Sequence, residues 1–141
     1  MNMIYSFDSA AMLALAIGHH RAGRLAEAES AYAEIVQREP VNADALHLLG
    51  VVAYQTGRHD TALALISKAL ALNPLAPEYH NSLGGVRQAM GEETDAIRLY
   101  LHAIHLKDDY LEPYHNIIRL RPTSVEVRFN LGCVLQRLGR I

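Results

Sequence analysis

The chain of 141 residues has little of what several classes of protein require. Its single cysteine, Cys133, excludes an internal disulfide framework and a zinc site built on cysteines. The formal net charge of −2 lacks the basic excess that nucleic-acid-binding proteins use to displace counterions from phosphates. The apolar run at 10–17 is about half the length of a membrane helix, and the N-terminus has no basic signal region. We therefore expect a cytoplasmic protein that binds neither nucleic acid nor membrane.

Signatures of catalysis are also missing. The sequence contains no glycine-rich phosphate loop, no Cys-x-x-Cys pair, no His-Glu-x-x-His and no nucleophile elbow. Among its eight histidines, His102 and His105 share a helix face and could supply two metal ligands. No carboxylate completes that face, because Asp108 and Asp109 fall at the helix end. We expect no enzyme activity, no cofactor and no metal site.

What the sequence does contain is a period of 34 residues. When the chain is aligned with itself at this interval, the same or a similar residue type recurs in four independent columns. Between two glycines of the period, apolar residues recur at helical spacing. Each glycine is expected in a left-handed turn between two helices, each alanine at a close helix crossing, and each proline at the end of a second helix. The columns are Gly23, Gly57 and Gly91; Ala28, Ala62 and Ala96; Pro40 and Pro74; and Leu15, Leu49, Leu83 and Ile117.

Helix start signals fit this pattern of paired helices. Asp8 with Ser9, and Asn42, stand where first helices should begin, and Thr123 with Glu126 reads as a capping box. No stretch alternates apolar and polar residues over the length of a strand. The sequence therefore predicts an all-α protein without a sheet.

These columns resemble the tetratricopeptide repeat, whose pattern is an aromatic, Leu-Gly, Tyr, then Ala, Phe and Pro at fixed spacing. The aromatic first position is missing throughout, and in the third repeat it holds His80, which we expect at the edge of the core. The resemblance implies a right-handed α-solenoid of about eight helices, with a lead at 1–8 and repeats at 9–42, 43–76 and 77–110. The matching residues are Met12, Leu15-Ala16, His19, Ala28, Tyr32 and Pro40; Leu46, Leu49-Gly50, Ala53, Ala62, Ile66 and Pro74; and His80, Leu83-Gly84, Arg87, Ala96 and Tyr100.

After residue 110 the period breaks. The interval from Ile117 to Leu131 is 14 rather than 34, so 20 residues of a standard repeat are missing. We predict a shortened irregular repeat at 111–124 with a helix near 112–120, then a partial repeat at 125–141 with a helix near 124–138. That last helix carries an apolar stripe with no capping helix after it, so either the chain is a fragment of a longer array or the stripe is buried against a second copy. The stripe consists of Val127, Leu131, Val134, Leu135 and Leu138.

The resemblance further implies a concave groove lined by the first helix of each repeat. The inward positions lack the Lys and Arg with which chaperone adaptors of the family hold a C-terminal carboxylate, and an asparagine ladder would be partial. The groove is apolar near the N-terminus and polar beyond, which favours an amphipathic helix or an extended segment with an apolar anchor. The implied groove residues are Leu13, Ile17, His20, Asp44, His47, Val51, Tyr54, Gln55, Glu78, Asn81, Gln88, Asn116 and Asn130.

The sequence thus predicts a non-catalytic scaffold that binds a protein or peptide in its groove. Two alternatives stay open. The amino-acid sequences of the repeats also resemble those of bacterial repeat arrays that precede glycosyltransferase, sulfotransferase or methyltransferase domains. The chain could therefore be the targeting module of a larger transferase. The uncapped final helix could instead make it a self-assembling structural protein, a homo-oligomer joined through that helix.

Overall fold

The computed structural model describes residues 6–140, so part of the predicted N-terminal lead lies outside the described residues. These residues form eight α-helices and no strand, which confirms the all-α prediction. The chain divides into two compact units, the first ending at Leu72 and the second beginning at Asn73. No helix within the described part is both long and apolar enough to cross a membrane.

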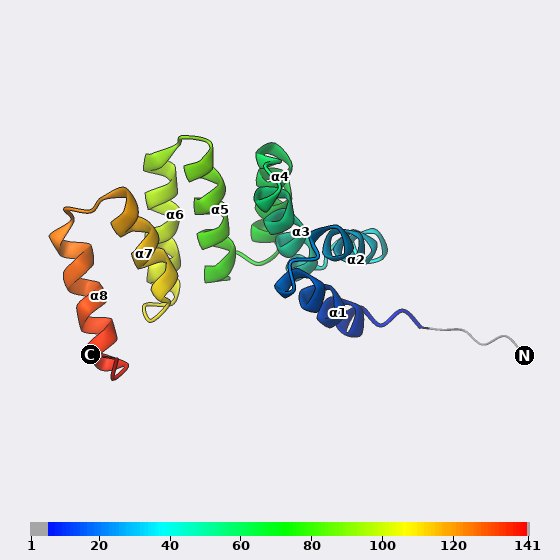
Figure 1. The fold of residues 1–141 in the computed structure, drawn as a ribbon, viewed down its shortest axis with the longest axis horizontal. Helices are drawn as coiled ribbons and strands as arrows, with labels where there is room; N and C mark the ends of the chain where they lie inside the picture. Colours follow the sequence, from blue (N-terminus) through cyan, green and yellow to red (C-terminus); the bar gives the residue numbers. More distant parts are fainter. Residues whose placement is uncertain (1–5, 141) are drawn as a thin grey trace, which may run out of the picture. The chain divides into compact units, whose positions relative to one another are not determined.

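Each unit is a succession of helices joined by short turns (Figure 1). The first unit contains α1 (Ser9–Arg21), α2 (Leu25–Arg38), α3 (Ala43–Gln55) and α4 (His59–Leu72). The second unit contains α5 (Pro77–Ala89), α6 (Glu93–Leu106), α7 (Leu111–Leu120) and α8 (Val125–Arg137). Asp8 and Asn42 cap α1 and α3 as predicted, each accepting a backbone N–H with its side chain at 3.0 Å.

The glycine column forms the turns between paired helices. Gly23, Gly57 and Gly91 have φ values of 78°, 82° and 80°, in the left-handed region that glycine adopts without steric cost. The N–H that follows each glycine closes the turn onto the preceding helix, as from Arg24 to the His19 carbonyl at 2.9 Å. The prediction of left-handed turns at these positions is confirmed.

The core of the first unit depends on small residues at helix crossings. Ala16, Ala28, Tyr32 and Val52 form one cluster and are fully buried. In the next helix pair, Gly50 lies against Ile66, and a Cβ at Gly50 would be 2.6 Å from Ile66 Cγ1. The α3–α4 crossing is therefore closer than any side chain larger than glycine permits without a shift.

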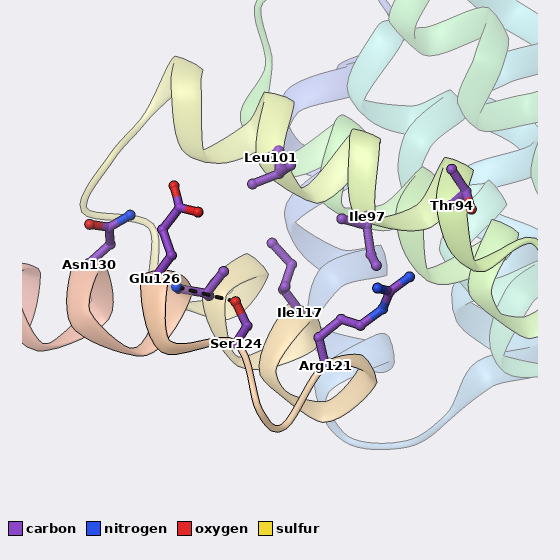
Figure 2. Close-up of a pocket in the computed structure, with 9 residues that line it drawn as sticks. Thr94, Ile97, Leu101, Ile117, Arg121, Ser124, Glu126 and Asn130 are labelled. Atoms are coloured by element: carbon purple, nitrogen blue, oxygen red, sulfur yellow. Dashed lines mark hydrogen bonds between the residues drawn. The ribbon is translucent and has the colours of Figure 1, made fainter.

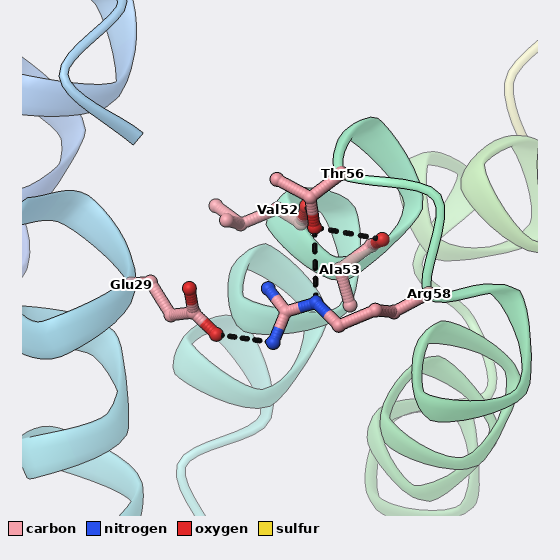
Figure 3. A network of polar contacts seen from close by, with 5 residues as sticks. All are labelled: Glu29, Val52, Ala53, Thr56 and Arg58. Carbon is pink, nitrogen blue, oxygen red and sulfur yellow. Dashed lines mark hydrogen bonds and ion pairs between the residues drawn. The ribbon is translucent and has the colours of Figure 1, made fainter. Parts of the chain in front are cut away.

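An ion pair adds a polar link between α2 and the α3–α4 turn (Figure 3). Arg58 Nη1 lies 2.6 Å from Glu29 Oε1, and Arg58 Nε donates to Thr56 Oγ1 at 3.0 Å. The Thr56 hydroxyl in turn donates to the Val52 carbonyl at 2.9 Å. The guanidinium is thus held on two sides, and its hydrogen bond to Glu29 raises the pKa of Arg58.

The second unit repeats the same packing. Ala96, Tyr100 and Ile117 form its central cluster. Gly84 lies against the Tyr100 ring, and a Cβ at Gly84 would be 2.6 Å from Tyr100 Cε1. The Leu-Gly column therefore serves the same purpose in both units, since each glycine makes room for a bulky side chain of the following helix.

The irregular region differs from the sequence prediction in two respects. The capping box assigned to Thr123 and Glu126 is wrong, because Ser124 caps α8 and its hydroxyl accepts the Val127 N–H at 3.5 Å. Helix α8 begins one residue later than a box at Thr123 requires.

The second difference concerns the apolar stripe of α8, which was expected to be covered by further repeats or by a second copy but is largely buried within the chain itself. Leu131 and Val134 are buried with Tyr114 of α7, and Val127 and Leu135 pack against the same cluster. These four residues of the stripe are covered because α7, although short, presents its own apolar face to α8, whereas the fifth, Leu138, is exposed. The large apolar side chains that α8 does expose are Val125, Phe129 and Leu138, and the first two lie outside the predicted stripe.

Candidate partner-binding surfaces

In the first unit, α1 and α3 bring together four of the predicted groove residues. His20 stands between two partners, with Nδ1 3.1 Å from the Tyr32 hydroxyl and Nε2 2.7 Å from Gln55 Oε1. Both contacts are satisfied when Nε2 donates to the amide oxygen and Nδ1 accepts the phenol proton. Leu13 and Ile17 are half-buried on the same helix as His20 and pack against the core cluster.

A hollow of about 330 Å³ opens beside this cluster. Its walls come from three helices of the first unit: Ile17, His20 and Arg21 from α1, Tyr32 from α2 and Leu48 from α3. Ile17 and Leu48 supply apolar surface, while His20 and Arg21 supply polar groups. The hollow can therefore take an apolar side chain with a polar or acidic group next to it.

The other predicted residues of α3 differ in accessibility. Asp44 and Tyr54 are exposed and Val51 is half-buried. His47 is only 8% exposed, and burial lowers the pKa of its imidazole to about 4, partly offset by the Asp44 carboxylate. His47 is therefore neutral near pH 7 and presents little surface to a ligand.

In the second unit, two predicted asparagines meet. Asn116 Nδ2 of α7 donates to Asn81 Oδ1 of α5 at 3.1 Å, and Asn116 Oδ1 accepts from Arg119 at 2.9 Å. Asn81 is 5% exposed, so the pair joins α5 to α7 from the inside, and Asn116 is the more accessible member.

Two more predicted residues lie on α5. Gln88 Oε1 accepts the Tyr100 hydroxyl at 2.7 Å, whereas Glu78 is exposed in the first turn of the helix. Nearby, burial and the Glu112 carboxylate raise the pKa of the Tyr110 phenol, so it stays protonated at neutral pH.

Asn130 lies elsewhere, on the rim of a cleft of about 290 Å³ between α6 and α8 (Figure 2). The buried side chain of Ile117 lies beneath this cleft, and Arg121 on one side forms an ion pair with Glu93 at 2.7 Å. Sequence reasoning missed the cleft. The only available signal was the break in the period, because the cleft forms where α8 follows a short helix. The remaining lining residues are Thr94, Ile97, Leu101, Ser124, Glu126 and Val127.

Of the two histidines considered as metal ligands, His102 lies against His80. His80 and His102 stack with ring centroids 4.2 Å apart and planes at 18°, and His80 Nε2 donates to the Pro74 carbonyl at 2.8 Å. His80 is 7% exposed, as expected for a residue at the core edge. Burial, His80 and His105 together lower the pKa of His102. Within 6–140, no group of three His, Cys, Asp or Glu side chains could hold a metal ion.

Helix pairs with a 34-residue period, glycine turns and a Leu-Gly crossing define a helical repeat protein. A family model of the tetratricopeptide repeat matches residues 13–77 and 57–110. The chain belongs to the tetratricopeptide repeat family, as its sequence predicted. It is therefore a repeat scaffold of the protein-interaction class.

Relatives of known sequence are much longer than this chain. The probable UDP-N-acetylglucosamine–peptide N-acetylglucosaminyltransferase SEC of Arabidopsis thaliana is 31% identical over 103 residues. That match covers 73% of this chain and 10% of the plant protein. The chain thus spans about a tenth of the length of this curated relative.

Solved structures share the fold. An O-GlcNAc transferase of Thermobaculum terrenum matches with a TM-score of 0.82 and 29% identity, over 94% of this chain and 27% of that one. The first tetratricopeptide domain of Spaghetti (RPAP3), bound to an HSP90 peptide, matches with a TM-score of 0.68 and 17% identity. That likeness covers 96% of this chain and 97% of the other, and at this identity it shows the fold alone.

Proposed function

We propose that the chain is a non-catalytic scaffold that takes an apolar anchor residue of a partner protein or peptide into the hollow of its first unit. The observation that carries this proposal is the hollow itself, with its apolar walls and polar rim. Burying a leucine-sized side chain there would contribute about 1.5–3 kcal/mol to binding. A single anchor of this size suits a reversible interaction.

The polar side chains at the rim of the hollow suggest which residues of the partner would flank its anchor residue. Arg21 is exposed beside the hollow and favours an acidic residue in the partner. His20 is held by Tyr32 and Gln55, so its ring orientation is set before a ligand arrives. An amphipathic helix or an extended segment with an apolar residue next to an acidic one fits this arrangement.

The other predicted groove residues divide into two groups under this proposal. His47 and Asn81 are buried, so they support the surface rather than touch a ligand. Direct contacts to a ligand of the first unit come from its more accessible side chains, which are Leu13, Asp44, Val51, Tyr54 and Gln55. The accessible groove residues Glu78, Gln88, Asn116 and Asn130 belong to the second unit and take no part in binding at the hollow.

A peptide-display selection against the chain tests the proposal. Selected peptides should share an apolar residue with an acidic neighbour, and Ile17→Glu should abolish their binding because it places a charge in the hollow. Leu15→Glu is the matched control, since Leu15 lies on the same helix and is 60% exposed. Circular dichroism verifies that both variants fold. Peptides that bind wild type and Ile17→Glu equally would refute the hollow as the binding site.

A second candidate function is the targeting module of a larger transferase. It is supported by the likeness to the plant N-acetylglucosaminyltransferase and to the Thermobaculum terrenum enzyme, each of which extends far beyond the matched region. Sequencing the gene on both sides of the region that encodes this chain tests it. An in-frame catalytic domain would favour the targeting module, and in-frame stop codons on both sides would rule it out.

A cytoplasmic location also remains a proposal. It is supported by the single unpaired cysteine, Cys133, which is exposed and would be open to oxidation outside a reducing compartment. Fractionation of source cells with an antibody to the chain would test it.

A further inference from the structure

The cleft between α6 and α8 has a floor of apolar side chains. Ile97 and Leu101 lie one helical turn apart on α6 and line one side of it. Val127 of α8 lines the other side, and Ile117 of α7, only 2% exposed, lies beneath. Leu101 is 48% exposed, so a ligand in the cleft would remove its apolar surface from water.

The rim of the cleft carries neutral polar groups that can bond to a peptide backbone. The Asn130 amide offers both a donor and an acceptor, and the Thr94 hydroxyl does the same from the opposite side. Ser124 accepts the Val127 N–H at 3.5 Å and keeps its own proton to donate (Figure 2). An extended segment needs such partners, whereas the backbone of a helix is already paired with itself.

The charges around the cleft leave one carboxylate without a partner. Arg121 is neutralised by Glu93 at 2.7 Å, whereas Glu126 is exposed and forms no ion pair within the described part of the chain. Arg128 follows two residues later on α8, where side chains do not face each other, and it donates to the Pro122 carbonyl at 2.7 Å. Two carboxylates and one guanidinium thus leave one negative charge at the cleft, which favours a cationic ligand.

We propose that this cleft binds an extended segment of a partner protein, which inserts an apolar side chain and places an arginine or lysine next to it. The floor takes the apolar side chain, Glu126 pairs with the cation, and Asn130 and Thr94 bond to the backbone. Arginine suits the carboxylate better than lysine does, because its guanidinium can donate two parallel hydrogen bonds.

This preference is opposite to that of the hollow in the first unit, where Arg21 favours an acidic neighbour of the anchor. The cleft belongs entirely to the second unit, so each site can bind or fail to bind without the other.

Amide NMR spectra of the full chain, titrated with a capped peptide Gly-Arg-Leu-Arg-Gly, test the proposal. Concentrations up to about 5 mM are needed, because one anchor residue gives a dissociation constant near the millimolar range. Amides of residues 94–101 and 121–130 should shift. The peptide Gly-Glu-Leu-Glu-Gly should bind there about fivefold more weakly or worse, because it meets Glu126 with a like charge. Shifts confined to residues 17–21 and 48 would report the hollow instead. The cleft proposal is wrong if neither peptide shifts the cleft amides, or if both bind there equally.

Substitution of the unpaired carboxylate tests the charge preference. Glu126→Gln should remove most of the preference for the arginine peptide while keeping a side chain of similar size. Asp60→Asn is the matched control, because Asp60 is also an exposed acid in the first turn of a helix but lies in the first unit. Its preference should equal that of wild type. The same loss in both variants would trace the preference to the overall charge of the chain and contradict a role of Glu126.

Substitution in the floor tests the anchor. Leu101→Ser should weaken binding of the arginine peptide about fivefold or more, because the anchor loses apolar contact surface. Leu15→Ser, at a leucine that is 60% exposed in the first unit, is the control and should bind as wild type does. Circular dichroism verifies that both variants fold. Equal binding by wild type and Leu101→Ser would overturn the proposal.

Other occupants of the cleft would give different results. Peptide display on the Ile17→Glu variant, whose hollow is blocked by a charge, should select an apolar residue with a basic neighbour. Selected peptides with apolar residues three and four apart and no basic neighbour would indicate a helix instead. Cleft amides that shift with the concentration of the chain alone would indicate a second copy. Either result would contradict an extended basic segment as the ligand.

Discussion

Replacing Gly84 by alanine is a sharp test of the packing described here. The added Cβ would stand 2.6 Å from Tyr100 Cε1 and 2.8 Å from Cδ1, so the ring or the helix must move. The ring is poorly placed to move, because Tyr100 is 1% exposed and its hydroxyl donates to Gln88 at 2.7 Å. The same substitution at Gly132 meets no atom within 4 Å and serves as the matched control.

The expected free energies of unfolding follow from these contacts. Overpacking a core costs about 1–3 kcal/mol, and weakening the Tyr100 hydrogen bond adds about 0.5–1.5 kcal/mol. Alanine recovers about 1 kcal/mol because it favours the helix more than glycine does. The first repeat packs Ala16 in one cluster with Tyr32, so a small adjustment of helix spacing is available and the cost should lie low in the range. We expect Gly84→Ala to destabilise the protein by about 1–2 kcal/mol and Gly132→Ala to stabilise it by up to about 1 kcal/mol.

Urea unfolding, monitored by circular dichroism, gives the free energy of unfolding of both variants. The informative quantity is the difference between the two alanine variants, because helix propensity contributes equally to each. If Gly84→Ala and Gly132→Ala stabilise the protein equally, the Tyr100 ring is not fixed against Gly84. The packing argument would then be refuted.

Three further predictions concern the turn, the crossing and the pH response. Gly57→Val should lower the free energy of unfolding by about 1–2 kcal/mol or more, because φ is 82° there, whereas Gly18→Val in an open helical position should change it little. Ala62→Leu should cost about 1–3 kcal/mol by overpacking a fully buried crossing, and unchanged melting temperatures for it and for Gly57→Val would contradict the assigned register. Because the folded-state pKa of His47 is lowered to about 4 from about 6.5, stability is fully present above pH 6.5 and falls as the pH drops to 4, by about 3 kcal/mol. Urea titrations at several pH values should show this slope, and an unchanged slope in His47→Gln would assign it to other groups.

Much of the local structure followed from the sequence alone. The 34-residue period placed Gly57 at a left-handed turn and Ala62 at a buried crossing, and both are found there. Such positions are predictable because the requirement is local, since only glycine adopts that φ freely and only a small side chain fits a close crossing. The short helix after residue 110 was also predicted, because its apolar spacing and the proline at position 122 set its bounds.

The candidate sites were less predictable, because they depend on which side chains meet. The family pattern named His20 and Gln55 separately, but only the fold shows that they share a hydrogen bond at 2.7 Å. It named Asn81 as a contact residue, whereas packing against α7 buries it. The cleft between α6 and α8 had no motif at all.

The sequence by itself determined the repeat, its turns and its family, because these follow from periodic local constraints on backbone and side-chain size. Only the tertiary structure decided which face of α8 is covered. The predicted stripe around Leu131 packs on α7, while Phe129 on the other side is exposed. A helix with apolar residues on two sides can bury either side. Which side is buried depends on where the neighbouring helix packs.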